Sequence, residues 1–284
     1  MDSEEENDKL NKINLQLDQA ELTSKSKERV RKALLLRKST SMFSIFDSAD
    51  YIKSAMLFEE LAEECKDDRI SSATFYKEAA ETFIKDNKEF SLWKASECYY
   101  KIYELFVKDM RDEASEFLQQ SCMLLVKIKS FEIAGMRYIK IAELYEMDKV
   151  SLAVINYKRA IESYSKVTNY KSNIYLVKKR LLSCCIYHKD INRVIETLKE
   201  YNYDFKYSKL CYLLMVYLKG DYEMLKEEEL DTEEESEVLE AILYKEPEDS
   251  IEIVKNFINE NVFNDLSNSL FELFLENYQV SKIC

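Results

Sequence analysis

Glycine and proline are almost absent from this sequence, and this scarcity limits the fold more than any other feature. The 284 residues include two glycines and one proline, namely Gly135, Gly220 and Pro247. Hairpin turns, phosphate-binding loops and sheet connections use both residue types repeatedly. We therefore expect an all-α protein whose helices are joined by short polar turns. A chain of this length should form two packed units or an elongated array in which each piece contacts its neighbours.

The sequence contains an internal repeat of amphipathic segments. Small residues begin these segments at intervals of 22, 19, 20 and 19 residues, at Ala73, Ala95, Ala114, Ala134 and Ala153. Larger apolar residues tend to follow each small residue on one helical stripe. Such stripes are Ala95, Tyr99, Ile102 and Phe106; Ala114, Leu118, Ser121 and Leu125; Ala134, Tyr138, Ile141 and Tyr145; and Ala153, Tyr157, Ala160 and Tyr164. Each segment is therefore interpreted as one helix, whose small side chains let a neighbouring helix approach closely.

Two such helices make one unit of about 40 residues, close to but longer than the tetratricopeptide period. We predict a tetratricopeptide-like (TPR-like) solenoid of antiparallel helix pairs that form a twisted, curved sheet over residues 1–205. The regularity fades after about Tyr201, and residues 206–284 are predicted to form an acidic helical bundle that caps the solenoid. Such arrays bind proteins. The alternative is a compact helical bundle without a binding face.

The usual ingredients of catalytic sites are missing from the sequence. His188 is the only histidine, and the two glycines are too far apart to form a GxGxxG motif or a phosphate-binding loop. The seven cysteines form no CxxC pair and lie mostly in apolar helical stretches, which suits a reducing compartment. We therefore expect no enzymatic activity, no cofactor and no metal. Because no apolar run has the length of a signal peptide or a membrane span, we expect a cytoplasmic protein.

Charge is distributed unevenly along the chain. The formal net charge of −13 disfavours nucleic-acid binding. Residues 221–252 contain fifteen acidic residues and two basic ones, whereas residues 166–209 contain ten basic residues and four acidic ones. A basic middle that meets an acidic partner and an acidic end that meets a basic partner would explain this separation. The alternative is that both regions are solvated helix faces.

A short apolar cluster lies near the N-terminus, outside the repeat. It comprises Met42, Phe43, Ile45 and Phe46, and it follows a basic approach with seven lysines and arginines between Lys25 and Lys38. Large apolar side chains on a turn beside several cations suit shallow insertion into an anionic membrane surface. The alternative is a hydrophobic turn that packs beneath the first helix pair.

In the order and spacing of these features, the sequence resembles the soluble NSF attachment proteins (SNAPs), and more specifically their α type. The resemblance covers most of the chain. Its closest stretches are Met42–Phe46 with Tyr51–Phe58; Ser130–Tyr164, which contains Ile141–Glu146; and Leu239–Ala241 with Val254–Lys255. The family implies an adaptor that coats a four-helix SNARE bundle, touches the membrane through its apolar loop and presents its C-terminal end to the hexameric ATPase NSF.

The resemblance also implies roles for individual residues. Lys108 and Arg180 fall at basic family positions for SNARE binding, whereas Lys129, Arg137, Lys178 and Lys179 lie beside other such positions. For NSF binding, Glu240 matches an acidic family position, Asp221 lies close to another, and Glu246, Glu248 and Asp249 lie just beyond two more. Ile283 keeps the penultimate apolar residue of the family tail, but the acidic residues around it are replaced, so stimulation of the ATPase is in question more than binding.

The resemblance therefore implies a cytoplasmic adaptor that associates peripherally with membranes and is a monomer when free. Three alternatives stay open at this point. A general TPR-type scaffold would share the solenoid without needing the apolar loop or the acidic end. A γ-type SNAP would not use the apolar loop on lipid. An enzyme subunit could take its active residues from a partner.

Overall fold

The computed structural model describes residues 24–37, 50–201, 205–222, 225, 230, 232–261 and 263–283, and all statements about structure refer to these residues. They form thirteen α-helices, labelled α2 to α14, and no β-strand. The expected all-α fold, built by stacking consecutive helices as in TPR-like arrays, is confirmed. The apolar cluster Met42–Phe46 lies outside the described residues.

The chain divides into two compact units, Met1–Ile141 and Ala142–Cys284. The division falls inside helix α7, Phe131–Tyr145. The boundary predicted from sequence, at residues 205 and 206, falls within the second unit and stays a prediction.

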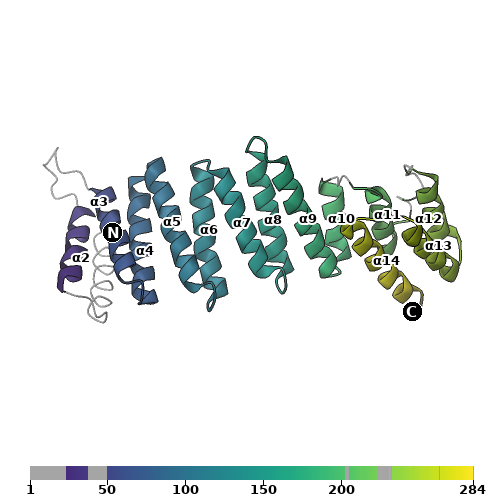
Figure 1. Cartoon of the computed structure of the whole chain (residues 1–284), viewed down its shortest axis with the longest axis horizontal. Helices are drawn as coiled ribbons and strands as arrows, with labels where there is room; N and C mark the ends of the chain where they lie inside the picture. Colours follow the sequence, from purple (N-terminus) through teal and green to yellow (C-terminus); the bar gives the residue numbers. More distant parts are fainter. Residues whose placement is uncertain are drawn as a thin grey trace. The chain divides into compact units, whose positions relative to one another are not determined.

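In the first unit, consecutive helices pack side by side (Figure 1). Helix α4 lies against both α3 and α5, and α5 also lies against α6. Because short turns join the helices from α3 onward, these successive helices run in opposite directions and form hairpins. The helices are α2, Ser24–Arg37; α3, Tyr51–Glu64; α4, Arg69–Asp86; α5, Glu89–Phe106; α6, Arg111–Lys127; and the first part of α7.

The stripes expected from the repeat are buried. Ala95, Ala114, Ala134 and Ala153 have no exposed surface, and neither do Leu118 and Tyr157. Ala73 and Phe106 are half-buried. The small residues admit a neighbouring helix while the large ones fill the space between its turns, and this close packing is the main stabilising interaction. The repeat seen in the sequence is therefore the core of the hairpins.

Most of the tight turns are made without glycine. Five other residues adopt a left-handed backbone with φ between 53° and 67°, at Asn87, Lys129, Asn169, Lys189 and Tyr207. At Asn87 this conformation ends α4, a position where glycine is the usual residue, whereas at Tyr207 it precedes the first residue of α11. Gly220, with φ of 84°, is the described glycine with this conformation. The scarcity of glycine thus leaves some strain in the turns rather than preventing them.

The second unit begins with further helices packed side by side and ends with a helix that packs back against earlier ones. Its helices are the end of α7; α8, Val150–Ser165; α9, Lys171–Tyr187; α10, Ile191–Tyr201; α11, Ser208–Leu218; α12, Glu233–Tyr244; α13, Pro247–Glu260; and α14, Asp265–Ile283. Helix α14 returns to pack against α9 and α11 (Figure 1). Aromatic rings also fill the contact between α13 and α14, where Phe257 and Phe271 pack with their ring centroids 5.8 Å apart.

Candidate functional site

The three consecutive cations of the basic middle lie on helix α9. Val177 and Leu181, on either side of them, are buried, which fixes the orientation of the helix. Lys178 and Lys179 are half-buried and Arg180 is exposed. The Nζ atom of Lys179 lies 4.0 Å from a carboxylate oxygen of the exposed Asp265. The structure therefore brings this group of predicted SNARE-binding residues to the surface of the second unit.

Arg180 has a carboxylate partner on α7, two helices earlier in the chain. Its guanidinium donates a hydrogen bond to Glu143 of α7. The two side chains are 52% and 40% exposed, so solvent reaches both. This hydrogen bond raises the pKa of Arg180. The positive charge at this position is therefore partly neutralised within the protein.

Acidic and aromatic groups surround this pair. One turn along the chain from Glu143, the carboxylate of Glu146 accepts a hydrogen bond from the buried Tyr157 hydroxyl. Burial, followed by this carboxylate, raises the pKa of Tyr157, which stays neutral. The backbone carbonyl of Glu146 is also within hydrogen-bonding distance of Nε2 of His188. Two carboxylates thus lie near one guanidinium.

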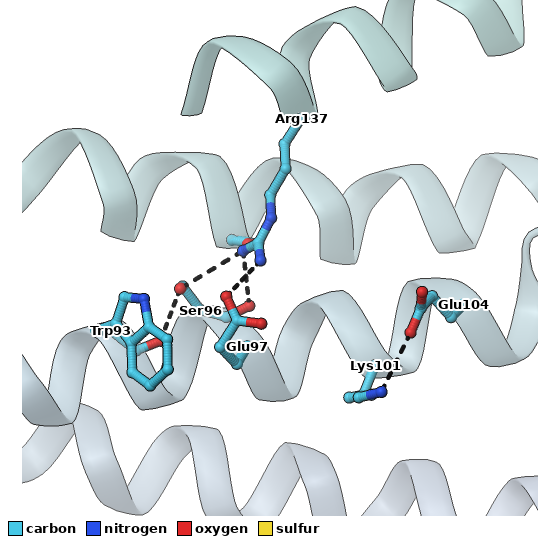
Figure 2. A network of polar contacts seen from close by, with 7 residues as sticks. Trp93, Ser96, Glu97, Lys101, Glu104 and Arg137 are labelled. Atoms are coloured by element: carbon cyan, nitrogen blue, oxygen red, sulfur yellow. Dashed lines mark hydrogen bonds and ion pairs between the residues drawn. The ribbon is translucent and has the colours of Figure 1, made fainter. Parts of the chain in front are cut away.

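Arg137 is placed differently from the other predicted SNARE-binding residues, because its guanidinium is buried in the first unit. Figure 2 shows it extending from α7 toward Ser96 and Glu97 of α5. It donates to the backbone oxygen of Ser96 at 3.2 Å, to the Glu97 carboxylate at 2.5 Å, and to the Ser121 hydroxyl of α6. It also lies 4.4 Å from the ring centroid of Tyr100.

These contacts occupy the guanidinium of Arg137 with groups from α5 and α6. The side chain is 7% exposed. A buried charge is tolerated when it is paired and hydrogen-bonded, as here. In the described structure Arg137 therefore joins three helices and has little surface left for a partner.

Lys108 and Lys129 are exposed and lie in turns. Lys108 follows α5, and Lys129 lies between α6 and α7 with a left-handed φ of 60°. The Lys129 turn is closed by a 2.8 Å hydrogen bond from the Ser130 amide to the Leu125 carbonyl. Both lysines belong to the first unit, whereas the α9 cations belong to the second. The predicted SNARE-binding residues are therefore divided between the two units.

The acidic residues predicted to bind NSF lie in the second unit. Five of them are exposed: Asp221, Glu240, Glu246, Glu248 and Asp249. Glu248 and Asp249 lie in the first turn of α13, which packs against α12. Negative charge stabilises a helix N-terminus by about 0.3–1 kcal/mol, so these two carboxylates also stabilise α13. The side chain of Ile283 lies outside the part of the chain that the structure describes.

The described cysteines are not activated for chemistry. Burial raises the pKa of the Cys184 thiol to about 12 and that of Cys185 to about 11. Thiols with such pKa values are almost entirely protonated at neutral pH and are poor nucleophiles. Among the described residues, no group of three or more His, Cys, Asp or Glu side chains could hold a metal ion.

Sequence reasoning missed the acidic partners of the basic residues. Lys94 of α5 contacts Glu59 of α3 at 3.0 Å, just as Arg137 contacts Glu97 and Arg180 contacts Glu143. We call these three contacts the cross-hairpin ion pairs, because each joins a helix to the helix two positions earlier. Their cations are spaced by 43 residues, Lys94, Arg137 and Arg180. This constant spacing, close to the hairpin period, is the signal that could have revealed them.

Comparison with known proteins identifies a family. The sequence model described as "Soluble NSF attachment protein, SNAP" matches residues 24–184, more than half of the chain. A search of the curated proteins finds no match. Within the described residues, no helix combines the length and apolarity needed to cross a bilayer.

Proposed function

Because the chain belongs to the soluble NSF attachment protein family, we propose that it is an adaptor that binds SNARE bundles and recruits an NSF-type ATPase to separate them. The family match carries the general role in vesicle trafficking, and the finer assignments rest on the surfaces described above. In this proposal the protein has no catalytic site of its own. It transmits force from the ATPase to its cargo.

The SNARE contact is proposed to include Lys178, Lys179 and Arg180 of α9, together with Lys108 and Lys129. Their exposure or partial exposure supports this assignment. Cations on such a surface attract an acidic bundle over a long range and tolerate variation in its sequence. Several weak contacts suffice when more than one adaptor copy acts on one bundle. Arg137 is proposed to act indirectly, by holding α7 against α5.

The ATPase contact is proposed to include Asp221 and Glu240, with Glu246, Glu248 and Asp249 beside them; Ile283 would add an apolar contact from the tail. The exposure of the five acidic residues supports this assignment. They lie in the turn after α11, on α12 and at the start of α13. An acidic surface of this kind suits a basic domain of the ATPase.

The membrane contact is proposed for Met42, Phe43, Ile45 and Phe46. Its support is the sequence alone, a cluster of large apolar residues close to several cations. Partitioning into the bilayer would raise the local concentration of the adaptor near membrane-anchored SNARE bundles. The protein would then associate with membranes peripherally.

The decisive experiment is a disassembly assay with purified SNARE bundles and an NSF-type ATPase, with and without this protein. We expect ATP-dependent disassembly to require it. Reversal of the α9 cations, Lys178→Glu, Lys179→Glu and Arg180→Glu, should weaken bundle binding at least tenfold and make it more sensitive to salt.

The matched control reverses three exposed lysines of the first unit, one in the turn before α4 and two on α4: Lys66→Glu, Lys77→Glu and Lys85→Glu. It changes the net charge by the same amount in another part of the molecule. Binding by this control should stay closer to that of the unmodified protein. Equal losses in both variants would assign the effect to net charge, and unchanged binding after the α9 reversal would remove these residues from the interface.

The membrane contact is tested with Phe43→Ser combined with Phe46→Ser. We expect this variant to bind anionic liposomes less and to disassemble membrane-anchored bundles more slowly, because two large apolar groups no longer enter the bilayer. Disassembly of bundles without membrane anchors should be unchanged. If both reactions slow equally, the two rings contribute to the fold rather than to membrane binding.

A further inference from the structure

The cross-hairpin ion pairs differ in how easily they can be opened. Arg137 and Glu97 are 7% and 31% exposed, and the guanidinium has further bonds to serine oxygens. Arg180 and Glu143 are 52% and 40% exposed. Water can replace either partner of the second pair at small cost, since an exposed ion pair contributes little to stability.

Arg180 is also in a locally acidic setting. Glu143 is its direct partner, and Glu146 lies near enough to help raise the pKa of Arg180. The neighbouring Tyr157 is neutral and is hydrogen-bonded to Glu146. An acidic partner that approaches Arg180 therefore meets two carboxylates as well as the cation, and it must compete with Glu143 for the guanidinium.

We propose that Glu143 is a built-in counter-ion of Arg180, which an acidic partner must displace, so that Glu143 sets the affinity of this surface. This inference rests on the proposed function for the nature of the partner, a four-helix SNARE bundle. Glu143 thus acts through Arg180 and lowers the affinity. An adaptor held less tightly to its cargo is released more readily after each round of disassembly.

The first test measures binding of purified SNARE bundles to Glu143→Gln. The amide keeps the size of the side chain and removes its charge, so the dissociation constant should fall roughly two- to fivefold, the scale of one exposed charge pair. The gain should shrink as salt is added. Weaker binding by this variant would overturn the inference, because it would mean that Glu143 orients Arg180 for the partner.

Two control variants separate this effect from a general change in charge. Glu276→Gln removes the same charge from an exposed pair with Lys189, whose nitrogen lies 2.7 Å from the carboxylate, and it should leave binding nearly unchanged. In a background of Arg180→Ala, the Glu143→Gln change should give no gain. A gain that persists without Arg180, or an equal gain from Glu276→Gln, would show that Glu143 acts by general repulsion and would overturn the inference.

The second test needs no SNARE bundle. Phenylglyoxal reacts with accessible arginine side chains, and peptide mass spectrometry follows each site separately. We expect Arg180 to react several times faster in Glu143→Gln, whereas buried Arg137 should react slowly in both proteins. An unchanged rate at Arg180 would overturn the inference. If the bundles do not bind the unmodified protein at all, the proposed function fails, while the reaction rate still decides whether Glu143 covers Arg180.

Discussion

Arg137 in the first unit and Arg180 in the second have equivalent places in the repeat but different roles. Each is 43 residues from the preceding cation of the cross-hairpin ion pairs, and each contacts a glutamate two helices earlier. Arg137 is buried with serine and tyrosine groups around it, whereas Arg180 is half exposed beside a second carboxylate. The same residue type at the same place in the repeat thus joins hairpin helices in the first unit and stays in contact with solvent in the second.

The neighbours of each arginine account for the difference. Around Arg137, the Ser96 carbonyl and the Ser121 hydroxyl accept hydrogen bonds that compensate for lost water, and the Tyr100 ring covers one face of the guanidinium. Arg180 donates a hydrogen bond to Glu143 and keeps contact with solvent. A buried charged group needs hydrogen-bond partners for nearly all of its donors, and the contacts of Arg137 come close to supplying them.

Among the changes that test this comparison, removal of the Arg137 side chain should have the largest effect on stability. Arg137→Ala leaves the Glu97 carboxylate without its ion-pair partner and removes the hydrogen bonds that Arg137 donates to Ser96 and Ser121. We expect the free energy of unfolding to fall by about 3 kcal/mol, the scale of breaking a largely buried pair. Urea unfolding followed by circular dichroism measures it.

Arg137→Lys is the matched variant, because it keeps the charge but lacks the planar fork that reaches several acceptors at once. Its free energy of unfolding should lie between that of the unmodified protein and that of Arg137→Ala. If Arg137→Ala unfolds at the same urea concentration as the unmodified protein, the buried network does not stabilise the hairpins and the comparison fails.

A smaller loss of stability is expected when the exposed pair of Arg180 and Glu143 is broken. Arg180→Ala should change the free energy of unfolding by less than about 1 kcal/mol, because the pair is exposed to solvent and screened by salt. The same urea titration measures this change, and the binding assay on SNARE bundles should show a clear loss. A stability loss as large as that of Arg137→Ala would mean that both arginines are structural.

The helical fold and much of its core were predictable from the sequence. The stripe of Ala114, Leu118 and Leu125 is apolar at helical spacing, and the structure buries all three residues completely. Such a pattern can be recognised within a single segment, because apolar residues at helical spacing lie on the side of the helix that its neighbours cover. Lys108 and Glu240 are exposed, and their binding roles stay predictions.

The candidate site was less predictable, because it depends on which helices meet. Lys129 and Arg137 were expected to have the same role, yet one is exposed in a turn and the other is buried among three helices. A sequence shows that a residue is charged but not which carboxylate on a distant helix lies beside it. Glu143 is 37 residues from Arg180, and nothing in its immediate surroundings marks it as a partner.

The sequence by itself determined that this chain is helical and repeats in hairpins, because the lack of glycine and proline and the spacing of small and large apolar residues act on each segment locally. Tertiary structure alone decided which cations are buried and which stay in contact with solvent. Electrostatic pairing depends on distances across helices, and those distances are set only when the hairpins pack.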